Sequence, residues 1–167
     1  DEVEGEIARG TVAKSDHLAE FPRRVHVQKR KRRLRGIERL AREMQKDGRV
    51  LAAHGDGLIV NVSSIAALNG IGSNIAYAAV KAGMDTLTKS LARSLAPAVR
   101  VMSVSPGVVD TDFVPGRDAA ALAKIAPTIP MKRVATAADV ARAITACATH
   151  LTYSTGSIII VDGGRAL

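Results

Sequence analysis

Three short apolar runs, separated by helical patterns, constrain this fold more than any other feature of the sequence. The runs are 57–64 (GLIVNVSS), 99–107 (VRVMSVSPG) and 156–164 (GSIIIVDGG). Each is rich in β-branched residues, and short continuous apolar runs are typical of strands that are buried on both faces of a sheet. The sequence therefore predicts a sheet whose two faces are covered.

Helical patterns occupy the stretches before and between these runs. They span 36–48, 74–96 and 136–151, the first ending at Gly48. In the last of them, Thr136 and Asp139 resemble a capping box with Asp in place of Glu. Strand, helix, strand, loop, helix, strand implies right-handed crossovers and a parallel sheet. We therefore expect an α/β fold with a doubly wound parallel sheet, Rossmann-like in architecture.

The first 35 residues differ in character from the rest of the chain. They show no strong strand pattern and no glycine-rich phosphate loop. The net charge of +8 comes from 23–35, which holds eight Lys and Arg residues and no acid, since the other 16 basic and 16 acidic residues balance. We expect an atypical basic segment at 1–35, disordered or disrupted, followed at 36–167 by the C-terminal part of a Rossmann-like domain that lacks the first βαβ units.

Composition argues against several other classes of protein. No run of about 18 apolar residues exists, so we expect no membrane span. The acidic N-terminus has no apolar stretch of the kind found in secretory signals, and the single cysteine, Cys147, cannot form an internal disulfide. These features favour a cytoplasmic protein. The four histidines do not fall at metal-ligand spacing with carboxylates or Cys147, so we expect no bound metal.

Residues 76–83 (AYAAVKAG) carry Tyr77, one of two tyrosines, and Lys81 four places later. Positions i and i+4 share one face of a helix, with Cβ atoms about 5–6 Å apart. A phenol keeps its proton at neutral pH, but an ammonium about 5 Å away favours the phenolate by roughly 3 kcal/mol at intermediate dielectric. Such a pair suits general acid–base chemistry, although a half-buried tyrosine beside a solvated lysine is the commoner arrangement when the pair is taken alone.

Hydroxyl groups are expected beside this pair. The first apolar run ends in Ser63 and Ser64, at the carboxyl edge of the predicted sheet, where doubly wound folds bind their ligands. Ser64 lies thirteen residues before Tyr77, across a loop of small residues. A hydroxyl there can hold a substrate carbonyl while the tyrosine exchanges a proton with it.

Five motifs in this order resemble the short-chain dehydrogenase/reductase family, and most closely its 3-oxoacyl-carrier-protein reductases. They are GLIVNVSS, the thirteen-residue Ser64–Tyr77 gap, AYAAVKAG, VSPGVVDTDF and GSIIIVDGG. The resemblance runs from about Gly36 to Leu167. It implies an oxidoreductase that transfers a hydride between NAD or NADP and an alcohol, ketone or acyl-thioester substrate, and it implies a homodimer or homotetramer.

The resemblance also implies roles for the matching residues. Tyr77 would be the general acid in carbonyl reduction and the general base in alcohol oxidation. Lys81 would favour the phenolate and bind the nicotinamide ribose, and Ser64 would orient the reacting carbonyl. The residues expected at the cofactor are Asn61, Tyr77, Lys81, Pro106, Gly107, Val109 and Thr111. Residues 112–130 would form the substrate loop, whereas the family's glycine-rich turn and its upstream asparagine have no counterpart here.

Two alternatives remain open from the sequence. One is a catalytically impaired remnant of such an enzyme, acting only as an oligomerising or binding protein. The other is a nucleic-acid-binding protein that uses 23–35, because a run of eight cations can bind phosphate backbones. That segment has no interleaved aromatic residues and the chain has no zinc-finger or helix-turn-helix spacing, so nucleic acid is not the expected partner.

Overall fold

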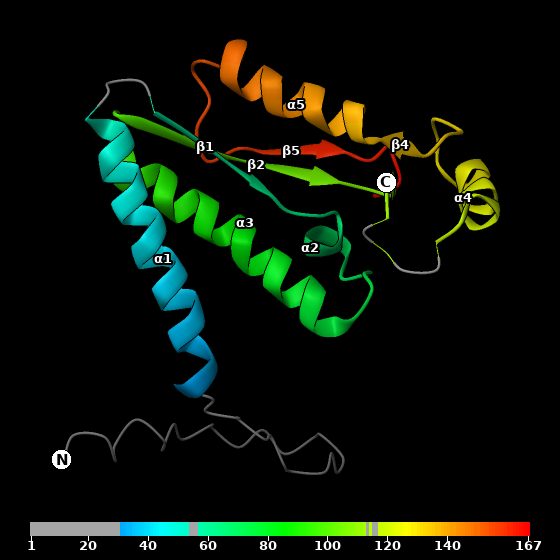
Figure 1. The fold of residues 1–167 in the computed structure, drawn as a ribbon, viewed down its shortest axis with the longest axis horizontal. Helices are drawn as coiled ribbons and strands as arrows, with labels where there is room; N and C mark the ends of the chain where they lie inside the picture. Colours follow the sequence, from blue (N-terminus) through cyan, green and yellow to red (C-terminus); the bar gives the residue numbers. More distant parts are fainter. Residues whose placement is uncertain (1–30, 54–56, 113, 115–116) are drawn as a thin grey trace, which may run out of the picture.

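A parallel sheet forms the centre of the part of the chain that the structure describes (Figure 1). The structure is a computed structural model that describes residues 31–53, 57–112, 114 and 117–167. The three strands follow the order β1-β2-β5 and are β1 (Gly57–Val62), β2 (Val99–Pro106) and β5 (Ile158–Val161). β1 pairs with β2 in parallel, from Gly57 opposite Val99 to Val62 opposite Val104. β2 pairs with β5 in parallel, from Ser103 opposite Ile158 to Pro106 opposite Val161.

Helices cover both faces of this sheet. α1 (Lys31–Ala52) and α3 (Ile75–Leu95) lie on one face, and α5 (Ala137–Thr149) lies on the other (Figure 1). The predicted doubly wound α/β architecture with a parallel sheet is therefore confirmed.

Strand β2 supplies core residues to both faces. Val99 and Val101 pack with Leu91 of α3 on one face, and Met102 and Val104 contribute to a second cluster on the other. Each of these five side chains is at most 2% exposed. Complete burial of an aliphatic side chain contributes about 1.5–3 kcal/mol. The central strand is thus held firmly, and the polar residues that follow it are held with it.

Helix α1 differs from its prediction at both ends. It begins at Lys31, inside the basic segment, and it continues through Gly48 to Ala52. A Cβ atom on Gly48 would lie 2.5 Å from Leu95 Cδ1, so the glycine is a point of close approach between α1 and α3 instead of a helix stop. The expected boundary at residue 35 therefore falls within a helix. Residues 1–30, and the expectation of disorder or disruption there, lie outside the described residues.

The stretch between the second apolar run and the last helical pattern, 108–135, contains short regular elements. They are β3 (Val109–Asp110), α4 (Ala119–Ile125), the 3₁₀ helix η1 (Ala126–Thr128) and the first residue of β4 (Ala135–Thr136). β3 pairs with β4 in parallel, which brings the beginning of the stretch to the beginning of α5. The predicted capping box is confirmed at that point, with Thr136 and Asp139 exchanging both hydrogen bonds. In the described part of the chain, no helix combines the length and the apolar character that crossing a bilayer requires.

Candidate active site

The carboxyl ends of β1 and β2 lie side by side and place polar residues at one edge of the sheet. The Ser63 amide donates to the Val104 carbonyl at 2.8 Å, and the Ile65 amide donates to the Pro106 carbonyl at 3.0 Å. Immediately beyond, the Ser64 hydroxyl accepts a hydrogen bond from the Ala66 amide at 3.2 Å, at the beginning of α2 (Ala66–Asn69). The serine predicted from the strand end therefore sits at the carboxyl edge of the sheet, the edge at which doubly wound folds bind their ligands.

Tyr77 lies in the first turn of α3. The Asn74 side chain caps this helix and accepts a hydrogen bond from the Tyr77 amide at 2.8 Å. An N-cap of this kind typically contributes about 1 kcal/mol, and here it fixes the start of the helix two residues before the tyrosine. Asn74 was not singled out from the sequence, although an asparagine immediately before the first helical residue is a recognisable cap signal.

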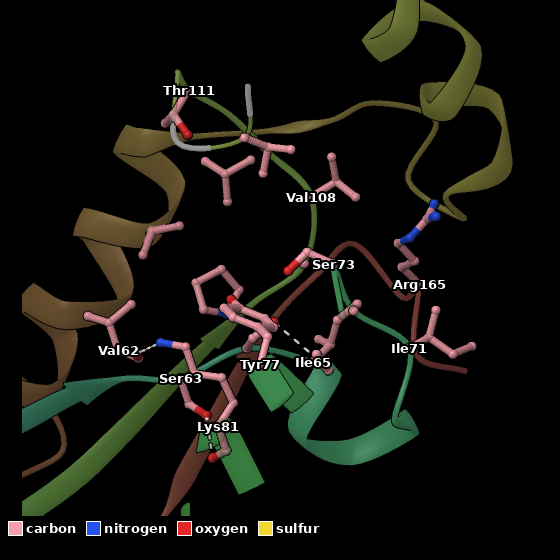
Figure 2. A pocket seen from close by; sticks show the side chains of 18 of the residues that line it. Val62, Ser63, Ile65, Ile71, Ser73, Tyr77, Lys81, Val108, Thr111 and Arg165 are labelled. Atoms are coloured by element: carbon pink, nitrogen blue, oxygen red, sulfur yellow. Dashed lines mark hydrogen bonds between the residues drawn. The ribbon is translucent and has the colours of Figure 1, made fainter. Parts of the chain in front are cut away.

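Lys81, one helical turn after Tyr77 in α3, is hydrogen-bonded to the end of β1. Its Nζ atom lies 5.6 Å from the centroid of the Tyr77 ring and donates a hydrogen bond of 2.7 Å to the Val62 carbonyl (Figure 2). The Ser63 hydroxyl donates to the Lys81 carbonyl at 3.2 Å, which ties α3 to the strand a second time. An ammonium has three N–H donors, so Lys81 keeps donors for a group entering from the cavity.

These side chains line one cavity of about 890 Å³. In Figure 2, Tyr77 and Lys81 lie in the lower middle of the view, Thr111 lies above them and Arg165 lies to their right. The predicted residues that line it together are Ser64, Tyr77, Lys81, Pro106, Gly107, Val109 and Thr111. A volume near 890 Å³ lies within the range typical of small-molecule and cofactor sites.

Asn61 is the predicted residue that the structure does not bring to this cavity. Its Nδ2 atom donates to the Thr88 hydroxyl at 2.8 Å, and Thr88 is completely buried. The hydroxyl in turn donates to the Met84 carbonyl at 2.9 Å. Asn61 therefore joins β1 to the middle of α3, about two turns after Lys81.

Several lining residues were missed by sequence reasoning because they come from elements far apart in the chain. Val140 and Ile144 of α5 supply part of an apolar wall. Arg117 and Arg165 add two guanidinium groups, and Arg165 Nη1 donates to the Thr128 hydroxyl at 2.9 Å. Together with Lys81, they make the described lining positively charged, since it contains no acidic side chain. No local motif signals this arrangement.

Gly107 allows the end of β2 to pass close to the C-terminal turn. A Cβ atom at this position would lie 2.8 Å from Asp162 Cβ and 2.9 Å from Asp162 Cα. The Asp162 carboxylate is itself fixed, because it accepts hydrogen bonds from the Gly164 amide at 2.8 Å and the Ala166 amide at 2.7 Å. The predicted motifs at 106–107 and 162–164 are thus two sides of one contact beside the cavity.

Charge and burial also settle the state of two groups near α5. The Arg133 guanidinium, together with the amide and hydroxyl of Thr136, holds the pKa of the Asp139 carboxyl well below its usual range. Arg133 Nη1 lies 2.6 Å from Asp139 Oδ2, so this carboxylate is a structural anion at the beginning of α5.

Burial raises the pKa of the Cys147 thiol, which agrees with its place in the core. Among the described residues, no cluster of three or more His, Cys, Asp or Glu side chains offers a metal site.

Comparison with known proteins identifies the family. The family model described as enoyl-(acyl carrier protein) reductase matches residues 10–166. The chain is 41% identical over 112 residues to the short-chain dehydrogenase/reductase homolog YusR of Bacillus subtilis, covering 67% of this chain and 85% of that protein. It is 36% identical over 135 residues to the 3-oxoacyl-[acyl-carrier-protein] reductase MabA of Mycobacterium avium, covering 80% of this chain and 50% of that protein.

Solved structures agree with this assignment. ElxO, solved with NADP bound, gives a TM-score of 0.66 at 28% identity, covering 73% of this chain and 51% of ElxO. The chain therefore belongs to the short-chain dehydrogenase/reductase family of oxidoreductases, as the sequence motifs predicted, and has its Rossmann-like fold. It spans about half the length of most of the curated relatives it matches, for example 50% of the mycobacterial reductase.

Proposed function

We propose that this chain carries the catalytic half of an oxidoreductase that moves a hydride between NAD or NADP and an alcohol or carbonyl substrate. The observation that carries the proposal is the gathering of Ser64, Tyr77 and Lys81 around one cavity at the carboxyl edge of a parallel sheet. These residues come from two elements, β1 with its following turn and α3, which the Lys81–Val62 and Ser63–Lys81 hydrogen bonds hold together.

Tyr77 is the proposed proton carrier. In carbonyl reduction its phenol O–H bond breaks and the proton moves to the carbonyl oxygen, which leaves a phenolate. The Lys81 ammonium, 5.6 Å from the ring centroid, stabilises that negative charge through the space between them. In alcohol oxidation the same phenolate takes the proton back. Ser64 is the proposed donor that holds the carbonyl oxygen within reach of Tyr77.

The cavity also suits the nicotinamide end of a cofactor. Lys81 keeps ammonium donors that a ribose hydroxyl can accept, and Pro106, Gly107, Val109 and Thr111 line the same space. When bound, the cofactor supplies or takes up the hydride. ElxO was solved with NADP, which supports a nicotinamide dinucleotide here without deciding between NAD and NADP. A ketone or 3-oxoacyl thioester is the proposed substrate class, by likeness to the mycobacterial 3-oxoacyl reductase.

The proposal is tested with two tyrosine variants of the purified chain. Oxidation of NADPH and of NADH is followed by absorbance with a 3-oxoacyl thioester and with a simple ketone. We expect Tyr77→Phe to lower kcat by about 10³-fold, because general acid–base catalysis contributes about 10²–10⁴-fold. Tyr153→Phe is the matched control, since Tyr153 is fully exposed and lies outside the cavity lining. Equal activity of the two variants would overturn the proposal.

A further inference from the structure

Two arginines beside the cavity take no part in the chemistry proposed above. Arg117 lies just before α4 and Arg165 lies in the turn after β5, and both line the cavity that Tyr77 lines. Arg117 is half-buried and Arg165 is exposed. A guanidinium is always charged in proteins, and its planar fork of N–H donors matches the two oxygens of a carboxylate. The pair therefore supplies anion-binding groups to a cavity whose proposed reaction does not use them.

The turn that carries Arg165 is held by a neighbouring aspartate. Asp162 is 9% exposed, and its carboxylate accepts hydrogen bonds from the Gly164 amide at 2.8 Å and the Ala166 amide at 2.7 Å. These two amides flank Arg165 along the chain, so its backbone is fixed on both sides. The Arg165 guanidinium donates from Nη1 to the Thr128 hydroxyl at 2.9 Å. Because a guanidinium has five N–H donors, Thr128 orients Arg165 and leaves it donors for a second partner.

The nearby acidic side chains do not neutralise either arginine. Both oxygens of Asp162 accept from backbone amides, and Asp118, next to Arg117, caps α4 by accepting from the Ala121 amide at 2.8 Å. In the part of the chain that the structure describes, neither Arg117 nor Arg165 forms an ion pair. The described lining of the cavity contains no Asp or Glu. The charge of the two guanidinium groups is therefore left for a group from outside these elements.

The position of Arg165 indicates which molecule carries the anion. In Figure 2, Arg165 lies to the right of Tyr77, on the side of Ile71, whereas Thr111 lies above Tyr77. Thr111 is one of the residues proposed for the nicotinamide, and Ile71 is a lining residue with no proposed cofactor role. This arrangement favours an anion on the substrate over the diphosphate of the cofactor.

We propose that Arg117 and Arg165 form a subsite for the carboxylate of a small oxo acid whose carbonyl group lies at Tyr77. A cavity of about 890 Å³ can hold both ends of one small molecule. The carboxylate accepts hydrogen bonds from the guanidinium groups and takes no part in the hydride transfer. The place of the carbonyl rests on the proposed function, whereas recognition of the carboxylate can be measured without turnover.

The first test compares the binding of levulinate and levulinamide, two oxo compounds of nearly the same shape that differ in charge. Titrations of the purified chain are followed by saturation-transfer NMR of each ligand. We expect levulinate to bind about tenfold more tightly, because each of two exposed charge contacts contributes about threefold. Added salt should reduce this advantage by screening the charges. Equal affinity for the two ligands, or no binding of either, would overturn the proposal.

Variants of the two arginines locate the carboxylate. Arg117→Met and Arg165→Met should each weaken levulinate binding about threefold, while unchanged levulinamide binding shows that the variants remain folded. Arg165→Lys should lose less affinity than Arg165→Met, because it keeps the charge without the planar fork. Arg93→Met is the matched control, since Arg93 is exposed on α3 and lies outside the cavity lining. An equal loss in Arg93→Met, or no loss in Arg117→Met and Arg165→Met, contradicts the proposal.

NADPH binding and turnover separate this subsite from the cofactor site and from the proposed function. If the two arginine variants weaken NADPH binding and not levulinate binding, the guanidinium groups hold the cofactor diphosphate and the proposal is wrong. If levulinate binds as expected but Tyr77→Phe is as active as Tyr153→Phe, the subsite stands and the proposed function fails. If Tyr77→Phe loses activity but levulinate binds no better than its amide, the proposed chemistry stands and the subsite fails.

Discussion

The two walls of the cavity are held in different ways. The wall at the sheet edge follows β1 and β2, and in β2 every residue except Arg100 is buried. The outer wall is built from the stretch between the end of β2 and the end of η1, and none of its lining residues is buried. They are Val108, Val109, Thr111, Val114, Arg117 and Thr128. In the stretch between Val108 and Val134, Ile129 is the only described residue that is buried, at 1% exposed.

The difference in burial suits the two walls to different roles, the inner wall to acid–base chemistry and the outer wall to substrate selection. Acid–base groups must keep their geometry within fractions of an ångström, so they belong on elements locked by packing and hydrogen bonds. The proposed acid–base groups meet this condition, Lys81 through its bond to Val62 and Tyr77 through the Asn74 cap. A wall with few buried contacts can vary in sequence at small cost in stability, which suits substrate selection. We therefore expect substitutions on the inner wall to affect kcat and those on the outer wall to affect KM.

Lys81→Met should have the largest effect after Tyr77→Phe. It removes the charge beside the phenol and the bond to the Val62 carbonyl, so kcat should fall by about 10²-fold. Lys89→Met is the matched control, because Lys89 is an exposed lysine two turns further along α3 and lies outside the cavity lining. Steady-state kinetics of both variants check this expectation. If Lys81→Met changes KM and leaves kcat unchanged, the assignment of kcat effects to the inner wall is wrong.

Gly107→Ala should destabilise the inner wall. The new methyl group would lie within 2.9 Å of the Asp162 backbone, and overpacking of this kind typically costs about 1–3 kcal/mol. Gly83→Ala is the opposite case, because it lies within α3 with no atom within 4 Å of the added Cβ. It should stabilise the chain by about 0.5–1 kcal/mol. Urea unfolding of both variants measures these changes in the free energy of unfolding. If Gly107→Ala leaves that free energy unchanged, the turn at Asp162 can move to accommodate the methyl group.

Asp139→Asn should weaken the start of α5 in a pH-dependent way. The folded-state pKa of Asp139 is lowered chiefly by the Arg133 hydrogen bond, so the ionised carboxylate stabilises the fold at any pH above its unfolded-state pKa of about 4. That contribution is lost as the pH falls toward the lowered folded-state pKa. We expect the variant to melt below the parent at pH 7, with the gap narrowing below pH of about 4. A gap independent of pH would contradict the ion pair as its source.

Arg165→Met should have the smallest effect. Arg165 is exposed and its guanidinium bonds to the Thr128 hydroxyl, so the residue belongs to the outer wall. For an anionic substrate we expect KM to rise by about threefold, typical of a weak surface charge contact, with kcat unchanged. Thr128→Val is a useful companion, because it removes the hydroxyl that orients the guanidinium. A loss of kcat as large as that in Lys81→Met would erase the distinction between the walls.

Local patterns in the sequence determined the strands of the central sheet, the main helices and most of the inner wall. Apolar runs predicted β1, β2 and β5, and the i, i+4 spacing placed Tyr77 and Lys81 on one face of a helix. The capping box at Thr136 was also readable, because a helix start depends on side chains three residues apart. All of these features depend on neighbours within a turn or a strand, so they can be found without coordinates.

The tertiary structure alone decided how distant elements meet. Gly48 lies at a close contact with Leu95 and does not end its helix, and Asn61 bonds to buried Thr88 and not to the cavity. Arg117 and Arg165 line the same space as Tyr77 although 40 to 88 residues separate them from it along the chain. Such contacts arise from how helices pack on the sheet, and no periodicity in the sequence encodes the distance between two packed surfaces.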